Sequence, residues 1–407
     1  MNTNWSKIGL TFFFIVALLG SIMRLAPFTA LFVEYKHILH AHSHVAFQGW
    51  VYIILFLLIS KIYIDKSMLE KRNYKLLFIT TIATVFGIMV SFLIQGYALF
   101  SIAFSSLFQV VNYWFVYRFF KDVKSSEKAK KHFFSIRFIK TAMLLMLFST
   151  FGPWAVGILS AKGLAGSEYF NSALYFFFHF QYNGWFTFAV LGLFFAWLEK
   201  INIGFDLKAA NTFFILSTFT IIPTYSLSLL GMSFANYFTL IATISATIQL
   251  YAVYYLMKSM RLSFKTVKRL FSPWAYSLLL VAASCFLFKN ILQFASTFSF
   301  VNNLAFENKF IIIGYIHLVM IGFISCFLLA ILFQLNWLKI NKTGLILLVT
   351  GFVLSEVTLI LLGLVPSDFL IQAIAILSFM MAIGLGLILI RQLTNSKTVL
   401  DVDTSND

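Results

Sequence analysis

Long apolar segments dominate the sequence and restrict what it can fold into. A helix that crosses the hydrocarbon core of a bilayer needs about 20 apolar residues. Twelve segments meet this requirement: 7–28, 40–60, 74–96, 99–120, 138–160, 172–198, 208–230, 234–257, 273–292, 309–333, 343–365 and 369–391. Because 61% of the residues are hydrophobic and only 11% are charged, a soluble globular protein is excluded. The sequence therefore predicts an all-α membrane protein with twelve transmembrane helices.

The basic residues predict how the helices are oriented. All but five of the 30 Lys and Arg lie at the termini or in alternate loops. The exceptions are Arg24, Lys36, Lys162, Lys289 and Lys309. The positive-inside rule then places both termini in the cytoplasm, and it explains the net charge of +16 without a nucleic-acid partner. Since the first span has no small-residue cleavage site, we expect it to stay in the plasma (bacterial inner) membrane, in contact with lipid.

A short motif occurs three times, each time as a histidine, a glycine five residues later and a large aromatic residue directly after the glycine. Its histidines are His44, His179 and His317. Their near-equal spacing indicates three repeats of four helices, forming three arcs. The expected repeats are approximately 1–137, 138–270 and 271–393, within one membrane domain over 1–393 that precedes a disordered cytoplasmic tail over 394–407.

The repeated histidines are candidate ligands. They fall on the second, sixth and tenth predicted helices, all of which enter from the outer face, so they are expected at one depth and in one shared site. His40 and His44, four residues apart, could also hold a metal by themselves, with His37 on the same stripe of the helix. His42 points nearly the opposite way. Polar packing residues, hydrogen-bonded across the bundle or to interfacial water, are the alternative.

Four further polar residues complete the candidate site. Gln48 and Asn183 lie four residues after two of the histidines, where they could orient a ligand. Arg24 is near the outer end of the first span. Glu356 is the only acidic residue deep inside a span, which makes it a candidate proton relay or a helix–helix hydrogen bond.

Twelve helices with ligand candidates on the second, sixth and tenth resemble the haem–copper oxidase subunit I superfamily, especially its nitric oxide reductase branch and the NnrS family of nitric-oxide-response proteins. The resemblance implies haem b on His44 and His317, with Arg24 at a haem propionate, and copper or another metal on His179. It also implies an oxidoreductase acting on O2 or NO, with a cytochrome or quinol as external electron donor.

Three departures from this family alter the expectation. The residue two before His317 is Tyr315 rather than a second histidine, segment 208–230 has no histidine, and Asn183 stands where the family has a tyrosine. We therefore predict a haem-binding protein without a complete binuclear centre. A twelve-helix solute or metal transporter, and a protein that handles copper or zinc at the outer face through residues 37–44, are the alternatives.

Overall fold

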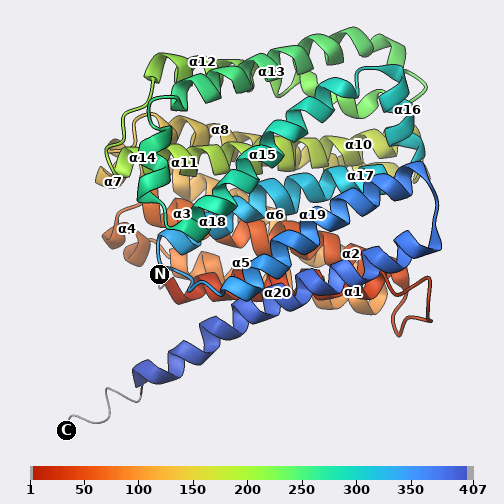
Figure 1. The fold of residues 1–407 in the computed structure, drawn as a ribbon, viewed down its shortest axis with the longest axis horizontal. Helices are drawn as coiled ribbons and strands as arrows, with labels where there is room; N and C mark the ends of the chain where they lie inside the picture. The colour runs from red at the N-terminus through yellow and green to blue at the C-terminus, as the bar shows by residue number, and fades with distance from the viewer. Residues whose placement is uncertain (1–2, 401–407) are drawn as a thin grey trace.

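The computed structural model describes residues 3–400, and over this part of the chain it contains helices and no strand (Figure 1). Among the described residues, ten helices are long and apolar enough to cross a membrane. They are Ser6–Met23 (α1), Tyr35–Tyr63 (α2, η2 and α3), Tyr74–Gln95 (α5), Leu99–Val123 (α6), Ser135–Ala161 (α8 and α9), Thr239–Met260 (α13), Pro273–Ala295 (α15), Lys309–Gln334 (α17, η6 and α18), Lys342–Leu364 (α19) and Asp368–Thr394 within α20. This is the architecture of a multi-pass membrane protein.

Two of the twelve predicted spans, 172–198 and 208–230, are not among these ten. Segment 208–230 is a bent pair, α12 (Leu207–Thr220) and the 3₁₀ helix Pro223–Leu229, at an angle of 50°; counting it as one span gives eleven. Pro223 has no N–H to continue the helix, which accounts for the break. Residues 168–200 are helical throughout, as α10 (Glu168–Phe178), η3 (His179–Phe186) and α11 (Thr187–Lys200), but their polar side chains keep them outside the apolar set.

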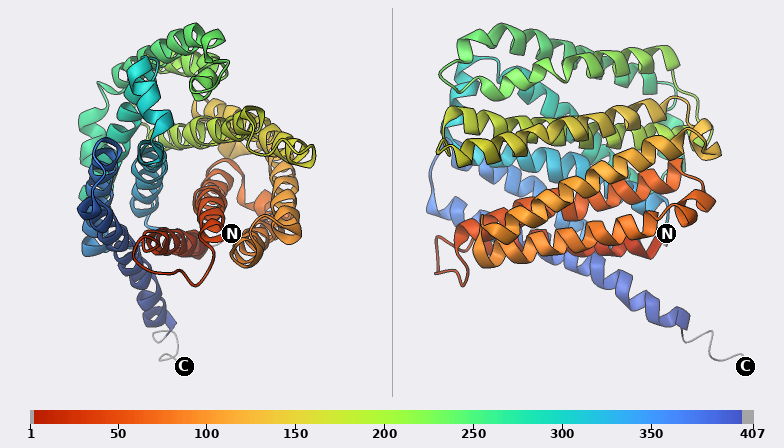
Figure 2. Two further views of the ribbon diagram at one scale, coloured as in Figure 1. Left: turned by 90° about the vertical axis from the view of Figure 1, so that its right-hand side faces the viewer. Right: turned by 180° about the vertical axis from the view of Figure 1, so that it is seen from behind.

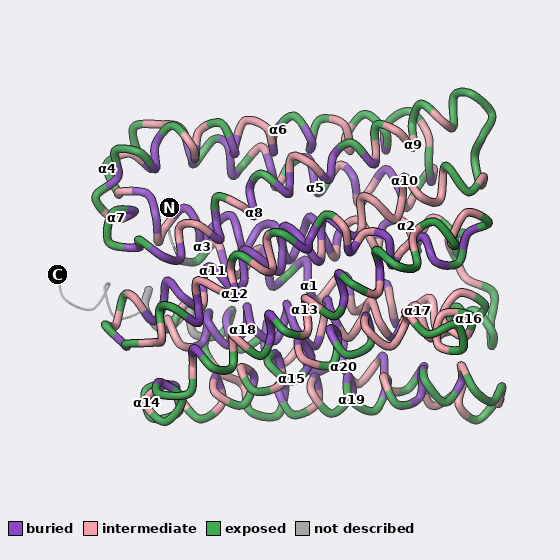
Figure 3. The backbone as a smooth tube through the Cα atoms, turned by 90° about the horizontal axis from the view of Figure 1, so that it is seen from above, coloured by how far each residue is buried: buried purple, intermediate pink, exposed green. Residues whose placement is uncertain are grey.

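Three helical segments form the interior of the bundle. α3 (Ile53–Tyr63), α11 and α18 (Cys326–Gln334) are buried over almost their whole length. Figure 2 shows them from the end of the bundle, surrounded by the other helices, and Figure 3 shows the exposed residues on the outer helices. A helix that is apolar on all sides is stable only when other helices or lipid surround it, and these are surrounded by protein.

Each of these segments is the last part of a longer helix, and we call these three helices, 35–63, 168–200 and 309–334, the first, second and third interior helices. Each interior helix contains a π-helical segment at the position of the repeated motif. These segments are η2 (Ala46–Tyr52), η3 and η6 (Leu318–Ser325). Hydroxyl groups at the ends of two segments donate to the carbonyl five residues earlier: Ser325, the last residue of η6, to Met320, and Thr187, directly after η3, to Tyr182, both at 2.7 Å. π-Helical turns are rare and occur often at functional sites. The motif found in the sequence is thus a recurring backbone feature.

The three π-helical segments meet one another. The Trp50 indole donates to the Ser325 hydroxyl at 2.8 Å, which joins η2 to η6. The rings of Tyr52 and Trp185 lie 6.3 Å apart and join η2 to η3, while η3 also contacts η6. The interior helices therefore touch at the level of the motif.

The glycine of each motif allows close packing against a long helix that precedes it in the sequence. The nearest atom of that helix would lie 2.5 to 3.2 Å from a Cβ added at these glycines. The contacts are Gly49 with Phe12 of α1, Gly184 with Leu145 of α8 (Ser135–Ser149) and Gly322 with Cys285 of α15. Three pairs of helices therefore pack in the same way, each through the glycine of one motif.

Helices α19 and α20 (Asp368–Leu400) approach closely through two glycines. A Cβ on Gly344 would lie 2.6 Å from the Gly384 carbonyl oxygen, and one on Gly384 would lie 2.7 Å from the Gly344 carbonyl oxygen. Small residues that bring two backbones together are typical of helix packing in membranes.

The two ends of the described chain lie at one end of the bundle. Figure 1 places the N-terminus beside α4 (Lys66–Lys71), α7 (Glu127–Lys130) and α14 (Phe264–Leu270), with α16 (Ser299–Glu307) at the opposite end. α20 runs out at the N-terminal end and is helical to Leu400, so the tail predicted to be disordered from residue 394 begins as helix. Residues 401–407 of that tail lie outside the described residues.

Candidate functional site

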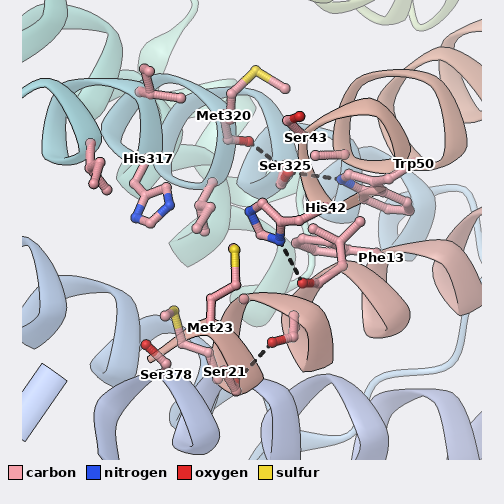
Figure 4. Close-up of a pocket in the computed structure, with 18 of the residues that line it drawn as sticks. Phe13, Ser21, Met23, His42, Ser43, Trp50, His317, Met320, Ser325 and Ser378 are labelled. Carbon is pink, nitrogen blue, oxygen red and sulfur yellow. Dashed lines mark hydrogen bonds between the residues drawn. The ribbon is translucent and has the colours of Figure 1, made fainter. Parts of the chain in front are cut away.

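A cavity of about 240 Å³ lies between the first interior helix, α17 (Lys309–His317) with η6, and the outer helices α1 and α20. Its wall is mainly apolar, with Phe13, Trp50, Met320 and Met381 among the lining residues. Two histidines, His42 of α2 (Tyr35–Val45) and His317 of α17, face it from different helices (Figure 4). Apolar clefts with a few convergent polar groups are typical binding sites for cofactors and small molecules.

The His42 ring is fixed by a backbone hydrogen bond. Its Nδ1 lies 2.9 Å from the Val16 carbonyl oxygen, and since a carbonyl only accepts, Nδ1 carries the proton. The lone pair of the neutral ring is then on Nε2, the ligand nitrogen of this tautomer. Gly20 makes room for the ring, because a Cβ there would lie 3.0 Å from His42 Cε1. Metal-binding histidines usually have such a carbonyl partner on the other nitrogen.

His317 lies beside an acidic side chain. Its Nδ1 is 3.8 Å from Glu356 Oε1 of α19, and neither atom has a hydrogen-bond partner among the described residues. The carboxyl is thus close enough to orient the Nδ1 side of the ring after a small movement. This leaves the Nε2 side as the one on which His317 can bind a ligand.

Arg24, one residue beyond α1, also lines the cavity. A guanidinium binds carboxylates and phosphates through parallel hydrogen bonds. The cavity therefore combines two imidazoles, a long apolar wall and one cationic group. These are the groups that would bind an apolar ligand carrying a metal and an acidic group.

His44 and His40 lie elsewhere. The His44 ring stacks on Phe92 of α5 at 4.4 Å, and its Nε2 is 3.3 Å from the Tyr97 hydroxyl. His40 packs edge-on against the same Tyr97 ring at 4.5 Å, while His37 pairs with Glu34 at 3.3 Å. The structure thus does not bring His44 to His317 as predicted. His42, which sequence reasoning set aside, takes that place.

The orientation of α2 explains this difference. Equal spacing in the sequence made His44 the counterpart of His317, but spacing does not show which side of a helix faces the interior. His42 and His44 are two residues apart and point to nearly opposite sides of α2, and the side that carries His42 lines the cavity. His42, Ala46 and Trp50, at four-residue spacing, form the stripe on the cavity that could have indicated the correct residue.

His179 is occupied by hydrogen bonds at both nitrogens. Nε2 donates to the Ile221 carbonyl at 2.8 Å, and Nδ1 accepts from the Asn183 amide at 3.3 Å. This arrangement differs from the prediction of His179 as a metal ligand oriented by Asn183, because both nitrogens of His179 are already engaged. Within the described part of the chain, no three His, Cys, Asp or Glu side chains form a group that could hold a metal ion.

Gln48, the other predicted orienting group, is buried on a second and much smaller cavity beside α6. It is therefore outside the large cavity that holds His42 and His317.

Together, the fold and this site define a helical multi-pass membrane protein with a two-histidine cavity beside its interior helices. A comparison with known protein families found no match, and no curated protein matches the chain.

Proposed function

We propose that the chain forms twelve transmembrane helices in three arcs of four, as in the haem–copper oxidase subunit I superfamily. The support is the threefold recurrence of one unit, in which an interior helix with a π-helical segment packs its motif glycine on the preceding long helix. On this proposal residues 168–200 and 207–229 each count as a span. The polar side chains of the first segment and the bend in the second would then be accommodated inside the bundle.

We propose further that the protein binds one haem b between His42 and His317. The observation that carries this is the pair of histidines on two helices facing one apolar cavity, with His42 already held at Nδ1. Arg24 would bind a propionate, and Met320, Met381 and Trp50 would contact the porphyrin. When bound, haem supplies one-electron redox chemistry.

The surrounding residues fit electron transfer better than gas reduction. Two histidines would occupy both axial positions of the haem, leaving none for O2 or NO. His179, the predicted ligand of a second metal, is engaged at both nitrogens. The protein itself positions the haem and keeps water from its faces. The electrons would come from an external cytochrome or quinol in the plasma membrane.

The experiment that tests this proposal is an optical spectrum of protein purified from haem-replete cells. We expect the spectrum of a b-type cytochrome, with about one haem per chain, that sharpens on reduction with dithionite. Carbon monoxide should leave the reduced spectrum unchanged, because it needs an open axial position. Colourless protein would contradict haem binding. Stoichiometric carbon monoxide binding would contradict the two-histidine ligation.

The proposed orientation predicts which loops are outside the cell. We expect single cysteines at the exposed positions Lys36, Gly163 and Asn303 to react with an impermeant thiol reagent on intact cells. Cysteines at Lys71 and Lys265 should react only after permeabilisation. Cys285 and Cys326 are buried, so the parent protein serves as the unlabelled control. The opposite labelling pattern would place the termini outside.

A further inference from the structure

A second, small cavity lies between the first interior helix, α6 and the helix that contains η3. It measures about 10 Å³ and is lined by both polar and aromatic side chains. Its polar lining residues are Gln48 and Tyr52 of η2, Gln109 and Asn112 of α6, and Gln181 of η3. Each of them is at most 7% exposed.

Most of these side chains lack partners. Gln48 Oε1, Tyr52 Oη, Gln109 Oε1 and Asn112 Oδ1 are all buried without a hydrogen bond to any described residue. Only Gln181 has one, since its amide donates to the Ser149 hydroxyl at 2.8 Å. Unpaired polar atoms are costly in a protein interior and more so at membrane depth, where lipid offers no replacement. Four of them around one cavity therefore indicate a common ligand.

The size and chemistry of the cavity identify that ligand. A water molecule needs roughly 10–15 Å³ and two to four polar partners, both of which are available here. The lining carries amides and a phenol but no charge, so an ion has no counter-charge. We propose that this cavity is a binding site for one structural water molecule, which donates to two of the three amide oxygens and accepts a hydrogen bond from the Tyr52 hydroxyl.

Among the described residues, no direct hydrogen bond connects these three helices beside the cavity. The proposed water would join them. It links the first interior helix to α6 and, through Gln181, to the second interior helix. The site is separate from the histidine cavity and does not depend on haem.

X-ray footprinting of the protein in nanodiscs in H₂¹⁸O tests the proposal, because radicals formed from a bound water oxidise the side chains next to it. Tyr63 is the internal control: it is equally buried, but its hydroxyl already donates to Ser135 at 2.9 Å. We expect ¹⁸O incorporation at Tyr52 to be several times faster than at Tyr63, because only Tyr52 would be in contact with a bound water. Equal rates at the two tyrosines would overturn the proposal.

Filling the site provides the second readout. Asn112→Leu replaces the amide by an apolar group of similar size and should reduce labelling of Tyr52 to the level of Tyr63. Gln109→Leu should do the same, so a failure of either variant to fold leaves the other as the test. Leu107→Ala, on the exposed side of α6, is the control and should leave the labelling unchanged. Continued labelling of Tyr52 in the leucine variants would show that these amides do not hold the water.

Discussion

Replacing His42 or His317 with alanine should reduce the haem content to roughly a tenth or less of the wild type, because each variant removes one of the two proposed axial ligands. His44→Ala should keep the haem, since its ring stacks on Phe92 outside the cavity. The three variants are compared by the pyridine haemochrome spectrum after purification, relative to protein concentration.

This comparison also decides between the two histidine pairings. The sequence favoured His44 with His317, whereas the cavity favours His42 with His317. Circular dichroism of each variant serves as the control for folding. Loss of haem in His44→Ala with retention in His42→Ala would contradict the structural pairing.

Replacing Gly384 with valine should destabilise the protein by about 3 kcal/mol or more, because the added side chain has no room to adjust. Its Cβ would lie 2.7 Å from the Gly344 carbonyl oxygen and 2.8 Å from the Leu348 amide nitrogen. Both atoms belong to the backbone of α19, so the two helices would have to separate. The change is measured as a lower thermal unfolding midpoint in detergent.

The matched control is Gly157→Val in α9 (Phe151–Ala161). This glycine has the same type of helical environment, but nothing lies within 4 Å of an added Cβ. We expect a small change in the unfolding midpoint there. Equal losses in the two variants would mean that valine in any helix, rather than the contact between α19 and α20, causes the effect.

The apolar segments predicted most of the helices because hydrophobic length is the main requirement for crossing a membrane. The exceptions have local causes. Residues 168–200 carry His179, Gln181 and Asn183, which reduce their hydropathy without preventing a helix inside the bundle. The bend between α12 and Pro223 depends on how one proline is accommodated, which hydropathy does not report.

The site was predicted less completely than the fold. His317 and Arg24, both candidates from the sequence, line the cavity, and Glu356, which the sequence singled out only as the acidic residue deep inside a span, lies beside His317. The choice of His44 instead of His42 depended on which side of α2 faces the cavity, and the spacing of the motif does not show this. The hydrogen bonds that saturate His179 come from Ile221 and Asn183, and only the folded chain shows that the Ile221 carbonyl is in reach.

The meeting of η2, η3 and η6 also affects how the bundle can move. A continuous α-helix resists bending along its whole length, whereas π-turns are points where helices bend readily. Here all three interior helices have such a turn, and the turns are tied to one another by the Trp50–Ser325 bond and the Tyr52–Trp185 contact. Flexing of the interior is thereby concentrated in a single layer. The histidine cavity lies beside this layer, since Trp50 and Ser325 also line the cavity.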